Sequence, residues 1–343
     1  FETGTDNLIS GVEFPQRFAG TRTVPTSGGG WNYGNIRDVN YFFENYKKIE
    51  EQDVRRGDYI QYVGVAHFFR AYYYFNLVQQ FGDVSYNTKT LLPSSEELYE
   101  PRTPRQQVVD SIIADLDKAI EYMNSGPIEG GTRLNKEIAQ LYKSRVCLFE
   151  GTWEKYHDGT VFGVENPKPD VYLQMAAEAA EAVINSDYHL YTDNDPENVY
   201  WDLFNNIDYS GNPEVMLWEK HSLDLKKTHS RQQFFNLRRN HGLGITKSLV
   251  DHYLCSDGEP IAQSPVYQGD STLTEVMANR DPRLNQTVWE PGDPMNIEAG
   301  DTTMVFEKSR LDESGETKCP TGYEIRKDSL PDLDKYAFAM SST

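Results

Sequence analysis

The side chains that could perform acid–base, nucleophilic or metal chemistry form no recognisable motif in this sequence. Its seven histidines include no HExxH or HxH pair, and its three cysteines, Cys147, Cys255 and Cys319, lie far apart. Zinc sites and disulfide frameworks need closely spaced or paired ligands, so we expect neither a metal nor a cofactor. Aspartate and glutamate are abundant, with 53 residues. Because a glycosidase requires only two carboxylates across one cleft, a helical glycoside hydrolase stays open as an alternative.

Aromatic side chains are the more informative group, since they make up 13% of the chain and include 22 tyrosines. A flat ring with a polar edge can stack on the apolar face of a sugar. Trp31 lies between a glycine-rich loop and a helix start, and Trp289 lies just before a Pro-Gly turn; burial in the core is the competing interpretation for both. We expect a shallow, non-catalytic site on these loops. Its stacking residues and hydroxyl donor would be Trp31, Tyr33, Tyr267, Trp289 and Arg22.

The charge balance limits the possible ligands. With 33 basic and 53 acidic residues, the chain has a formal net charge of -20. Nucleic acid and anionic lipid surfaces would be repelled, so we expect neither as a partner and favour neutral or cationic ligands. The sequence contains no apolar run of about 18 residues, which predicts that no segment spans a bilayer.

The elements that must position these residues begin with an aromatic helix over residues 64–83. Its apolar positions repeat at helical spacing but cover several sides of the helix, which predicts burial by other helices. Its three consecutive tyrosines at 72–74 are therefore expected to pack the scaffold. Asp58, followed by Gln61, has the pattern of a capping box and predicts the start of this helix.

Further helix starts recur along the chain. The predicted caps at Thr103, Asn135 and Asp170 are separated by 32 and 35 residues. This spacing is near the ~34-residue period of tetratricopeptide (TPR) helix pairs, although the repeat is irregular. An alanine-rich face in the helix after Asp170 would let a neighbouring helix approach closely. We expect a TPR-like helical scaffold over residues 31–190.

The remaining residues, 1–30 and 191–343, have more turn formers and shorter apolar runs. Two of these runs, Val215–Trp218 and Met304–Phe306, have the composition of strands. The expected fold is mainly α, with TPR-like helix pairs as a scaffold and an irregular, loop-rich half that contains short strands. We expect both halves to form one domain over residues 1–343, with ligand binding on the loops.

Six segments of the sequence have a pattern in common with one known family: Gly64–Asp83, Gly131–Phe149, Tyr172–Tyr188, Asn212–Val215, Ser248–Ile261 and Arg280–Leu284. They resemble the SusD/RagB family of nutrient-binding outer-membrane lipoproteins. They occur in the order typical of that family and extend from the first helix to about Tyr323.

The resemblance implies a non-catalytic protein that captures oligosaccharides, or in some members peptides. It implies a lipid anchor in the outer leaflet of the outer membrane and delivery of the ligand to a TonB-dependent SusC-type transporter. Ligand residues vary within this family, so the resemblance assigns none here. A TPR-type interaction adaptor inside the cell stays open as a second alternative.

Two departures from the family pattern stand out. The lipidated cysteine and the segment before the first helix are missing, and the sequence stops at Thr343, about where the family begins another buried helix. We therefore expect a fragment of a longer protein, in which the anchor is absent and an apolar face on the TPR-like side is uncovered.

Overall fold

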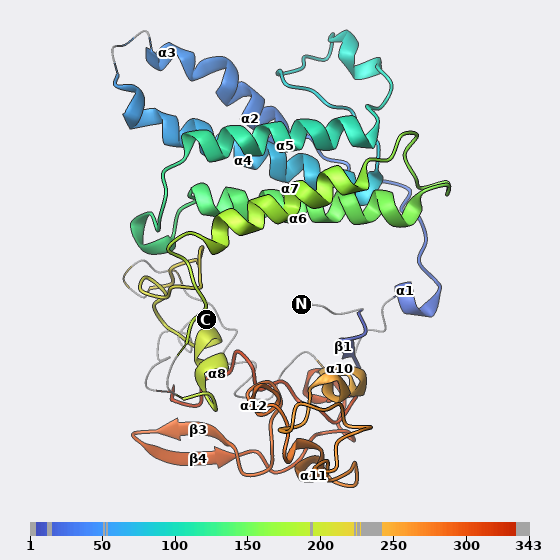
Figure 1. Ribbon diagram of the computed structural model, residues 1–343, viewed down its shortest axis with the longest axis vertical. Helices are drawn as coiled ribbons and strands as arrows, with labels where there is room; N and C mark the ends of the chain where they lie inside the picture. The colour runs from blue at the N-terminus through green and yellow to red at the C-terminus, as the bar shows by residue number, and fades with distance from the viewer. Residues whose placement is uncertain are drawn as a thin grey trace. The chain divides into compact units, whose positions relative to one another are not determined.

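The computed structural model describes residues 5–11, 16–50, 52, 54–192, 195–222, 224, 227 and 242–333 (Figure 1). The chain divides into two compact units. The helical unit comprises residues 24–190 and 209–219, and the loop-rich unit comprises residues 1–23, 191–208 and 220–343. A single domain over residues 1–343 stays a prediction.

The helical unit is built from long helices in adjacent pairs. In Figure 1, α5 lies along α4 and α7 lies along α6, which confirms the prediction of a mainly α scaffold of helix pairs. No helix in the described ranges combines the length and hydropathy that crossing a bilayer requires. The elements are α2 (Gly34–Asn45), α3 (Lys47–Glu50), α4 (Arg56–Phe81), η1 (Glu96–Tyr99), α5 (Arg105–Tyr122), η2 (Glu129–Gly131), α6 (Lys136–His157) and α7 (Pro169–Ile184).

The predicted caps are only partly correct. Asn135 caps α6 as predicted, because its side-chain oxygen accepts the Ile138 N–H at 2.9 Å. Thr103 does not cap α5, which begins at Arg105. Its backbone instead donates to the Val84 carbonyl at 3.0 Å in an isolated bridge. Thr103 pairs with Val84 as residues of neighbouring strands do, and this pairing takes the place of the predicted helix cap.

The aromatic helix also begins earlier than predicted. Helix α4 starts at Arg56, so Asp58 lies within its first turn. The predicted capping-box residue Gln61 has a different role. Its amide donates to the Leu134 carbonyl at 2.9 Å and accepts the Asn124 N–H at 2.7 Å. Gln61 therefore links α4 to the connection between α5 and α6.

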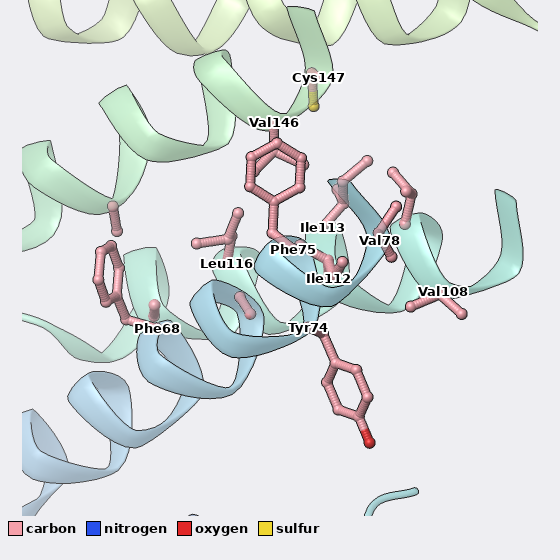
Figure 2. Close-up of a cluster of buried hydrophobic side chains, with 14 of the residues drawn as sticks. Phe68, Tyr74, Phe75, Val78, Val108, Ile112, Ile113, Leu116, Val146 and Cys147 are labelled. Carbon is pink, nitrogen blue, oxygen red and sulfur yellow. The ribbon is translucent and has the colours of Figure 1, made fainter. Parts of the chain in front are cut away.

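The core of the helical unit lies between α4, α5 and α6 (Figure 2). Tyr74 is fully buried and Tyr73 is partly buried, but Tyr72 is 38% exposed. The expectation that all three tyrosines pack the scaffold is thus wrong for Tyr72, whose position in the helical period points it outward. The buried residues labelled in Figure 2 are Phe68, Tyr74, Phe75, Val78, Val108, Ile112, Ile113, Leu116, Val146 and Cys147.

Helices α6 and α7 approach each other closely, as the alanine-rich face predicts. Helix α7 begins at Pro169, one residue before the predicted cap Asp170. Ala176 and Ala179 are buried. The Ser144 hydroxyl of α6 donates to the Ala176 carbonyl at 2.8 Å, a contact that larger side chains would prevent.

The loop-rich unit contains short elements and two small antiparallel sheets. Strand β1 pairs with β2, and β3 pairs with β4. Its elements are β1 (Leu8–Ser10), α1 (Gln16–Ala19), α8 (Val199–Phe204), β2 (Leu243–Ile245), α10 (Lys247–His252), α11 (Leu273–Met277), α12 (Pro282–Asn285), β3 (Pro294–Glu298), β4 (Asp301–Val305) and η3 (Gly315–Thr317).

The two predicted strands have different outcomes. Residues 304 and 305 lie in β4, so the run Met304–Phe306 is confirmed in part. The run Val215–Trp218 is not a strand, and that prediction is wrong. The Trp218 N–H donates to the Gly131 carbonyl at 3.0 Å and its indole N–H donates to the Gly130 carbonyl at 2.7 Å. These two hydrogen bonds attach the segment around Trp218 to η2, but they do not form the repeated backbone pairing of a β-sheet.

Candidate functional site

A glycine-rich turn positions Trp31 at the entrance to α2. Gly28, Gly29 and Gly30 have φ values of +72°, +64° and +87°, a region that favours glycine. The Gln80 amide donates to the Gly29 carbonyl. A Cβ atom on Gly30 would lie 2.5 Å from Gln80 Oε1, so a side chain there would displace the Gln80 amide that binds the turn.

Trp31 and Tyr33, two of the predicted site residues, lie together, with ring centroids 5.6 Å apart. Phe81 meets the Trp31 ring edge-on at 4.8 Å, and the Arg102 guanidinium carbon lies 4.7 Å from the centre of that ring. These contacts orient the indole by aromatic and cation–π attraction. The side chain is still 39% exposed, so part of the indole is accessible to a ligand.

The two rings line a pocket of about 370 Å³, which we call the Trp31 pocket. Its opposite wall is a segment tied to α2 by Asn40, whose amide donates to the carbonyls of Asn87 at 2.9 Å and Lys89 at 3.2 Å. Asn40 is 1% exposed, so this tie is shielded from water. The residues that line the pocket are Trp31, Tyr33, Gly34, Ile36, Arg37, Asn40, Ser85, Asn87, Lys89, Leu91, Glu97 and Leu98.

The Trp31 pocket contains one ion pair. Lys89 and Glu97 form an ion pair, and their hydrogen bond raises the pKa of Lys89 and lowers that of Glu97. Burial raises the pKa of Tyr33. Arg37 adds an exposed guanidinium to the lining. The pocket therefore offers an aromatic surface together with several hydrogen-bond donors and acceptors, which suits a polar ligand.

Arg22 and Tyr267, two further predicted residues, belong to the loop-rich unit. Arg22 is exposed on a segment without regular structure. Tyr267 is partly buried, and its hydroxyl donates to Asp270. Burial and that hydrogen bond raise the pKa of Tyr267 to about 12. The role of both residues in ligand binding stays a prediction.

Trp289 requires a correction. It was expected to present a partly exposed ring, but it is 2% exposed and forms a small core with Met295 and Phe306. Its ring stacks on that of Phe306, with centroids 6.2 Å apart and planes 14° apart. The Trp289 N–H donates to the Glu324 carbonyl at 3.0 Å. Packing against β3 and β4 has taken the ring away from solvent, so it offers no surface for stacking.

Sequence reasoning missed the second wall of the Trp31 pocket. Asn87, Lys89 and Leu98 come from a connection between α4 and α5 that has no recognised motif. The only sequence signal was Asn40, an amide on the apolar face of a predicted helix, because a buried polar side chain usually has a specific partner.

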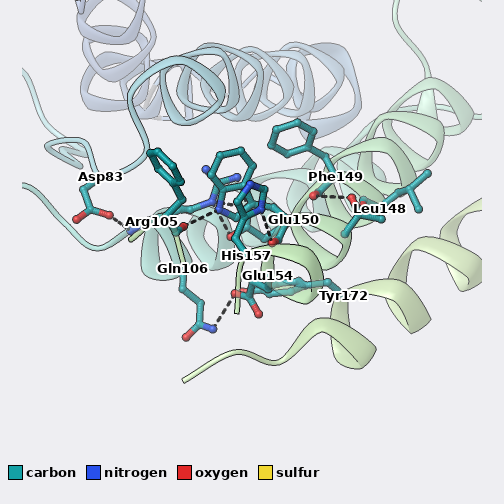
Figure 3. A network of polar contacts seen from close by, with 12 residues as sticks. Asp83, Arg105, Gln106, Leu148, Phe149, Glu150, Glu154, His157 and Tyr172 are labelled. Atoms are coloured by element: carbon teal, nitrogen blue, oxygen red, sulfur yellow. Dashed lines mark hydrogen bonds and ion pairs between the residues drawn. The ribbon is translucent and has the colours of Figure 1, made fainter. Parts of the chain in front are cut away.

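Buried carboxylates meet inside the helical unit, but they hold the helices together (Figure 3). Glu150 and Glu154 are both 0% exposed. Arg105 binds Glu150 through Nε at 2.8 and 2.9 Å and through Nη2 at 2.6 Å. Glu154 accepts from the Gln106 amide at 2.9 Å and from the Lys168 N–H at 2.6 Å. Neither carboxylate faces a cleft, so this pair does not have the arrangement of a glycosidase site.

Two family profiles match separate parts of this chain. A SusD-like profile, described as "Starch-binding associating with outer membrane", matches residues 29–148, and the SusD family profile matches residues 213–340. The chain belongs to the SusD/RagB family. The resemblance that the sequence motifs indicated is thereby confirmed.

Curated SusD-like relatives agree with this assignment. SusD-like protein P2 of Formosa agariphila is 32% identical over 168 residues, which are 48% of this chain and 29% of that protein. SusD-like protein P38 of the same organism is 36% identical over 122 residues, or 36% of this chain and 23% of that protein. The matches thus span less than a third of each relative.

Solved SusD-like structures share the fold. A SusD-like protein from Bacteroides fragilis superposes with a TM-score of 0.64 at 22% identity, covering 87% of this chain and 56% of that one. A SusD-like carbohydrate-binding protein from the same organism gives 0.59 at 19%, covering 85% and 52%. A structure determined with a xylogluco-oligosaccharide gives 0.60 at 15%, covering 97% and 59%. This chain spans little more than half the length of these structures.

One SusD-like motif has a clear structural role in the loop-rich unit. Arg280, the first residue of the Arg-Asp-Pro-Arg-Leu segment, is 6% exposed. Its guanidinium donates to the carbonyls of Val250 at 2.6 Å, Tyr253 at 2.8 Å and Val276 at 2.9 Å. Because the last carbonyls of a helix have no partner within it, Arg280 satisfies the ends of both α10 and α11.

Proposed function

We propose that this SusD/RagB-family protein captures oligosaccharides at the cell surface and passes them, chemically unchanged, to a TonB-dependent SusC-type transporter in the outer membrane. A lipid anchor would hold the full-length protein in the outer leaflet. The observation that carries the proposal is the pair of SusD-type profile matches, which cover most of the helical unit and much of the loop-rich unit. Related carbohydrate-binding structures add support for the ligand class.

We place ligand contact in the Trp31 pocket. Sugar rings have apolar faces and a rim of hydroxyl groups, so they bind where an accessible aromatic ring meets several donors and acceptors. The pocket combines the 39% exposed Trp31 ring with polar side chains such as Asn87 and Arg37. Its Lys89–Glu97 pair supplies both a donor and an acceptor without net charge. Arg37 adds further donors for sugar hydroxyl groups, so an oligosaccharide fits this chemistry.

A binding screen tests the proposal. The whole chain would be titrated calorimetrically with malto-, cello-, laminari- and xylogluco-oligosaccharides and with a set of short peptides. We expect an oligosaccharide to bind, and Trp31→Ala to weaken that binding by at least tenfold. Tyr156→Ala is the matched control, because Tyr156 is 74% exposed on the same unit and lies outside the pocket. If only peptides bind, the ligand is a peptide and not an oligosaccharide. Release of shortened sugars would establish that the protein is a glycoside hydrolase.

The transporter needs a separate test. We expect the full-length protein to co-purify with a SusC-type barrel when both are expressed in the same outer membrane. A protein that stays alone under those conditions, or that remains in the cytosol, would contradict delivery and favour a TPR-type adaptor.

A further inference from the structure

A second cleft, of about 480 Å³, lies in the loop-rich unit between α8, the end of α10 and the start of α12. Two partly buried tyrosines, Tyr200 and Tyr253, supply its aromatic surface. We propose that this Tyr200–Tyr253 cleft is a second carbohydrate site, selective for uncharged sugars. The proposal rests on the proposed function for its ligand class, but its residues are separate from those of the Trp31 pocket.

The walls of the cleft are held rigidly before any ligand arrives. The Trp201 N–H donates to Gln286 Oε1 at 2.7 Å, and the Gln286 amide donates to the Pro196 carbonyl at 3.0 Å. Gln286 is 1% exposed, so this link between α8 and α12 is buried. On the other side, Arg280 binds the Tyr253 carbonyl. A preformed site loses little conformational entropy on binding.

Both tyrosine rings are oriented through their hydroxyl groups. The Tyr200 hydroxyl accepts from Lys327 Nζ at 2.8 Å, and the Tyr253 hydroxyl lies 3.2 Å from Thr287 Oγ1. Burial raises the pKa of Tyr253, against the weaker effect of that hydrogen bond, so its ring stays neutral. Oriented, neutral tyrosine rings provide flat surfaces for the C–H faces of sugars.

An exposed ion pair supplies hydrogen bonds at the edge of the cleft. Arg283 Nε lies 2.9 and 3.1 Å from the two carboxylate oxygens of Asp281, and its Nη2 also donates to Asp281. The Arg283 side chain is 60% exposed, and the Nη1 edge of the guanidinium lies opposite this pair. Donors and acceptors side by side match the two roles of a sugar hydroxyl group.

His252 adds an acceptor to the same edge. Its Nδ1 lies 2.6 Å from the Ser248 carbonyl, which can only accept, so Nδ1 carries the proton. In the neutral imidazole Nε2 is then an acceptor on an exposed side chain. Arg283 is the one arginine or lysine among the residues that line the cleft, and Asp281 neutralises it. The Lys327 ammonium is outside that lining and is held by the Tyr200 hydroxyl and the Phe204 ring. An anionic sugar would be repelled by the net charge of -20.

Calorimetric titration of the whole chain tests the cleft. The probes are the four neutral oligosaccharide series above, with oligogalacturonides as the anionic series. We expect Arg283→Ala to weaken binding of a neutral oligosaccharide about tenfold, the usual effect of losing a charged hydrogen bond. Arg283→Lys, which keeps the charge but loses the planar fork, should give an intermediate loss. Arg133→Ala is the control, because Arg133 is a 64% exposed arginine in an ion pair with Glu129.

Hydrogen exchange locates the bound sugar. Protection of residues 247–254 and 281–285 on binding supports the cleft. Neutral sugar binding that Arg283→Ala leaves unchanged, with protection only at 31–40 and 85–98, overturns the second site and leaves the proposed function intact. Binding of oligogalacturonides alone at the cleft overturns its selectivity. Absence of binding to every oligosaccharide overturns the proposed function and the cleft together.

Discussion

The Tyr74 hydroxyl and the main chain of Asn87 form a reciprocal pair of hydrogen bonds. The hydroxyl donates to the Asn87 carbonyl at 2.8 Å and accepts the Asn87 N–H at 2.7 Å. One side chain of α4 therefore satisfies both backbone groups of a residue that lines the Trp31 pocket. The position of that wall depends on a tyrosine from the most aromatic helix of the chain.

Removing this hydroxyl should weaken both stability and ligand binding. Tyr74→Phe keeps the buried ring but leaves the Asn87 N–H without its partner. We expect a loss of about 1–3 kcal/mol in the free energy of unfolding, measured in urea. Hydrogen exchange at residues 85–91 should accelerate. Tyr72→Phe is the control, since Tyr72 is 38% exposed, and equal effects of the two variants would contradict this role for Tyr74.

Asp115 should make stability depend on acid pH. Burial acts to raise the pKa of Asp115, but hydrogen bonds from Arg70 at 2.6 and 2.7 Å and from His67 at 2.8 Å outweigh burial and lower it. A carboxyl with a lowered folded pKa stabilises the fold above its ordinary value of 3.8, and this contribution is lost as the pH falls below that value. Asp115→Asn should therefore cost about 3 kcal/mol at pH 7 and much less near pH 2.

The control for that prediction is Asp117→Asn. Asp117 lies on the same helix and pairs with Lys143 at 2.6 Å, but its side chain is 54% exposed. We expect a change within about 1 kcal/mol. Urea unfolding at several pH values measures both variants. A constant difference between wild type and Asp115→Asn from pH 7 to pH 2 would disprove the linkage.

Removal of Arg105 should make the free energy of unfolding depend on pH in the opposite direction. Burial raises the pKa of Glu150, and Arg105 opposes that rise. Arg105→Met removes the opposition and leaves a carboxylate that is 0% exposed without its cation, at a cost of about 3–5 kcal/mol at pH 8. The folded variant then binds a proton more readily than the unfolded chain. Its stability should recover as the pH falls toward the ordinary value of 4.5.

A second variant separates loss of charge from loss of packing. Arg105→Met combined with Glu150→Leu removes the unpaired Glu150 carboxylate, so most of the lost stability should return and the pH dependence should be smaller than in Arg105→Met. Thermal and urea unfolding at pH 5 and pH 8 provide the measurement. A double variant as unstable as Arg105→Met would show that the guanidinium acts through its 4.2 Å contact with Trp153 instead.

Gly151 should be intolerant of a side chain. A Cβ atom there would lie 2.8 Å from Leu173 Cγ and 3.0 Å from the Pro169 carbonyl, where α7 meets α6. Gly151→Ala should cost about 1–3 kcal/mol through overpacking, although alanine favours helices by roughly 1 kcal/mol. Gly57→Ala in α4 is the control, because nothing lies within 4 Å of its Cβ position. We expect that variant to be neutral or more stable in thermal unfolding.

Local patterns in the sequence predict the helices better than the sites. The helical spacing of apolar residues predicts the long helices, and Asn135 caps α6, as expected for an asparagine before a helix. Trp289 could not be placed by the same reasoning, because its burial arises from β3 and β4, which follow it in the chain. For a similar reason, sequence reasoning named only two of the residues that line the Trp31 pocket, Trp31 and Tyr33. Its wall at Asn87 is held by long-range bonds from single side chains, and such contacts leave no periodic signal.

Arg280 stabilises the loop framework of the Tyr200–Tyr253 cleft without contributing to the surface that a ligand would contact. Its guanidinium joins three carbonyls through main-chain atoms alone, so it does not depend on which side chains those positions carry. The side chains around the Tyr200–Tyr253 cleft could therefore be substituted without a change in the backbone conformation of the loops. A buried cation of this kind allows one framework to acquire new ligand specificities by substitution at its surface.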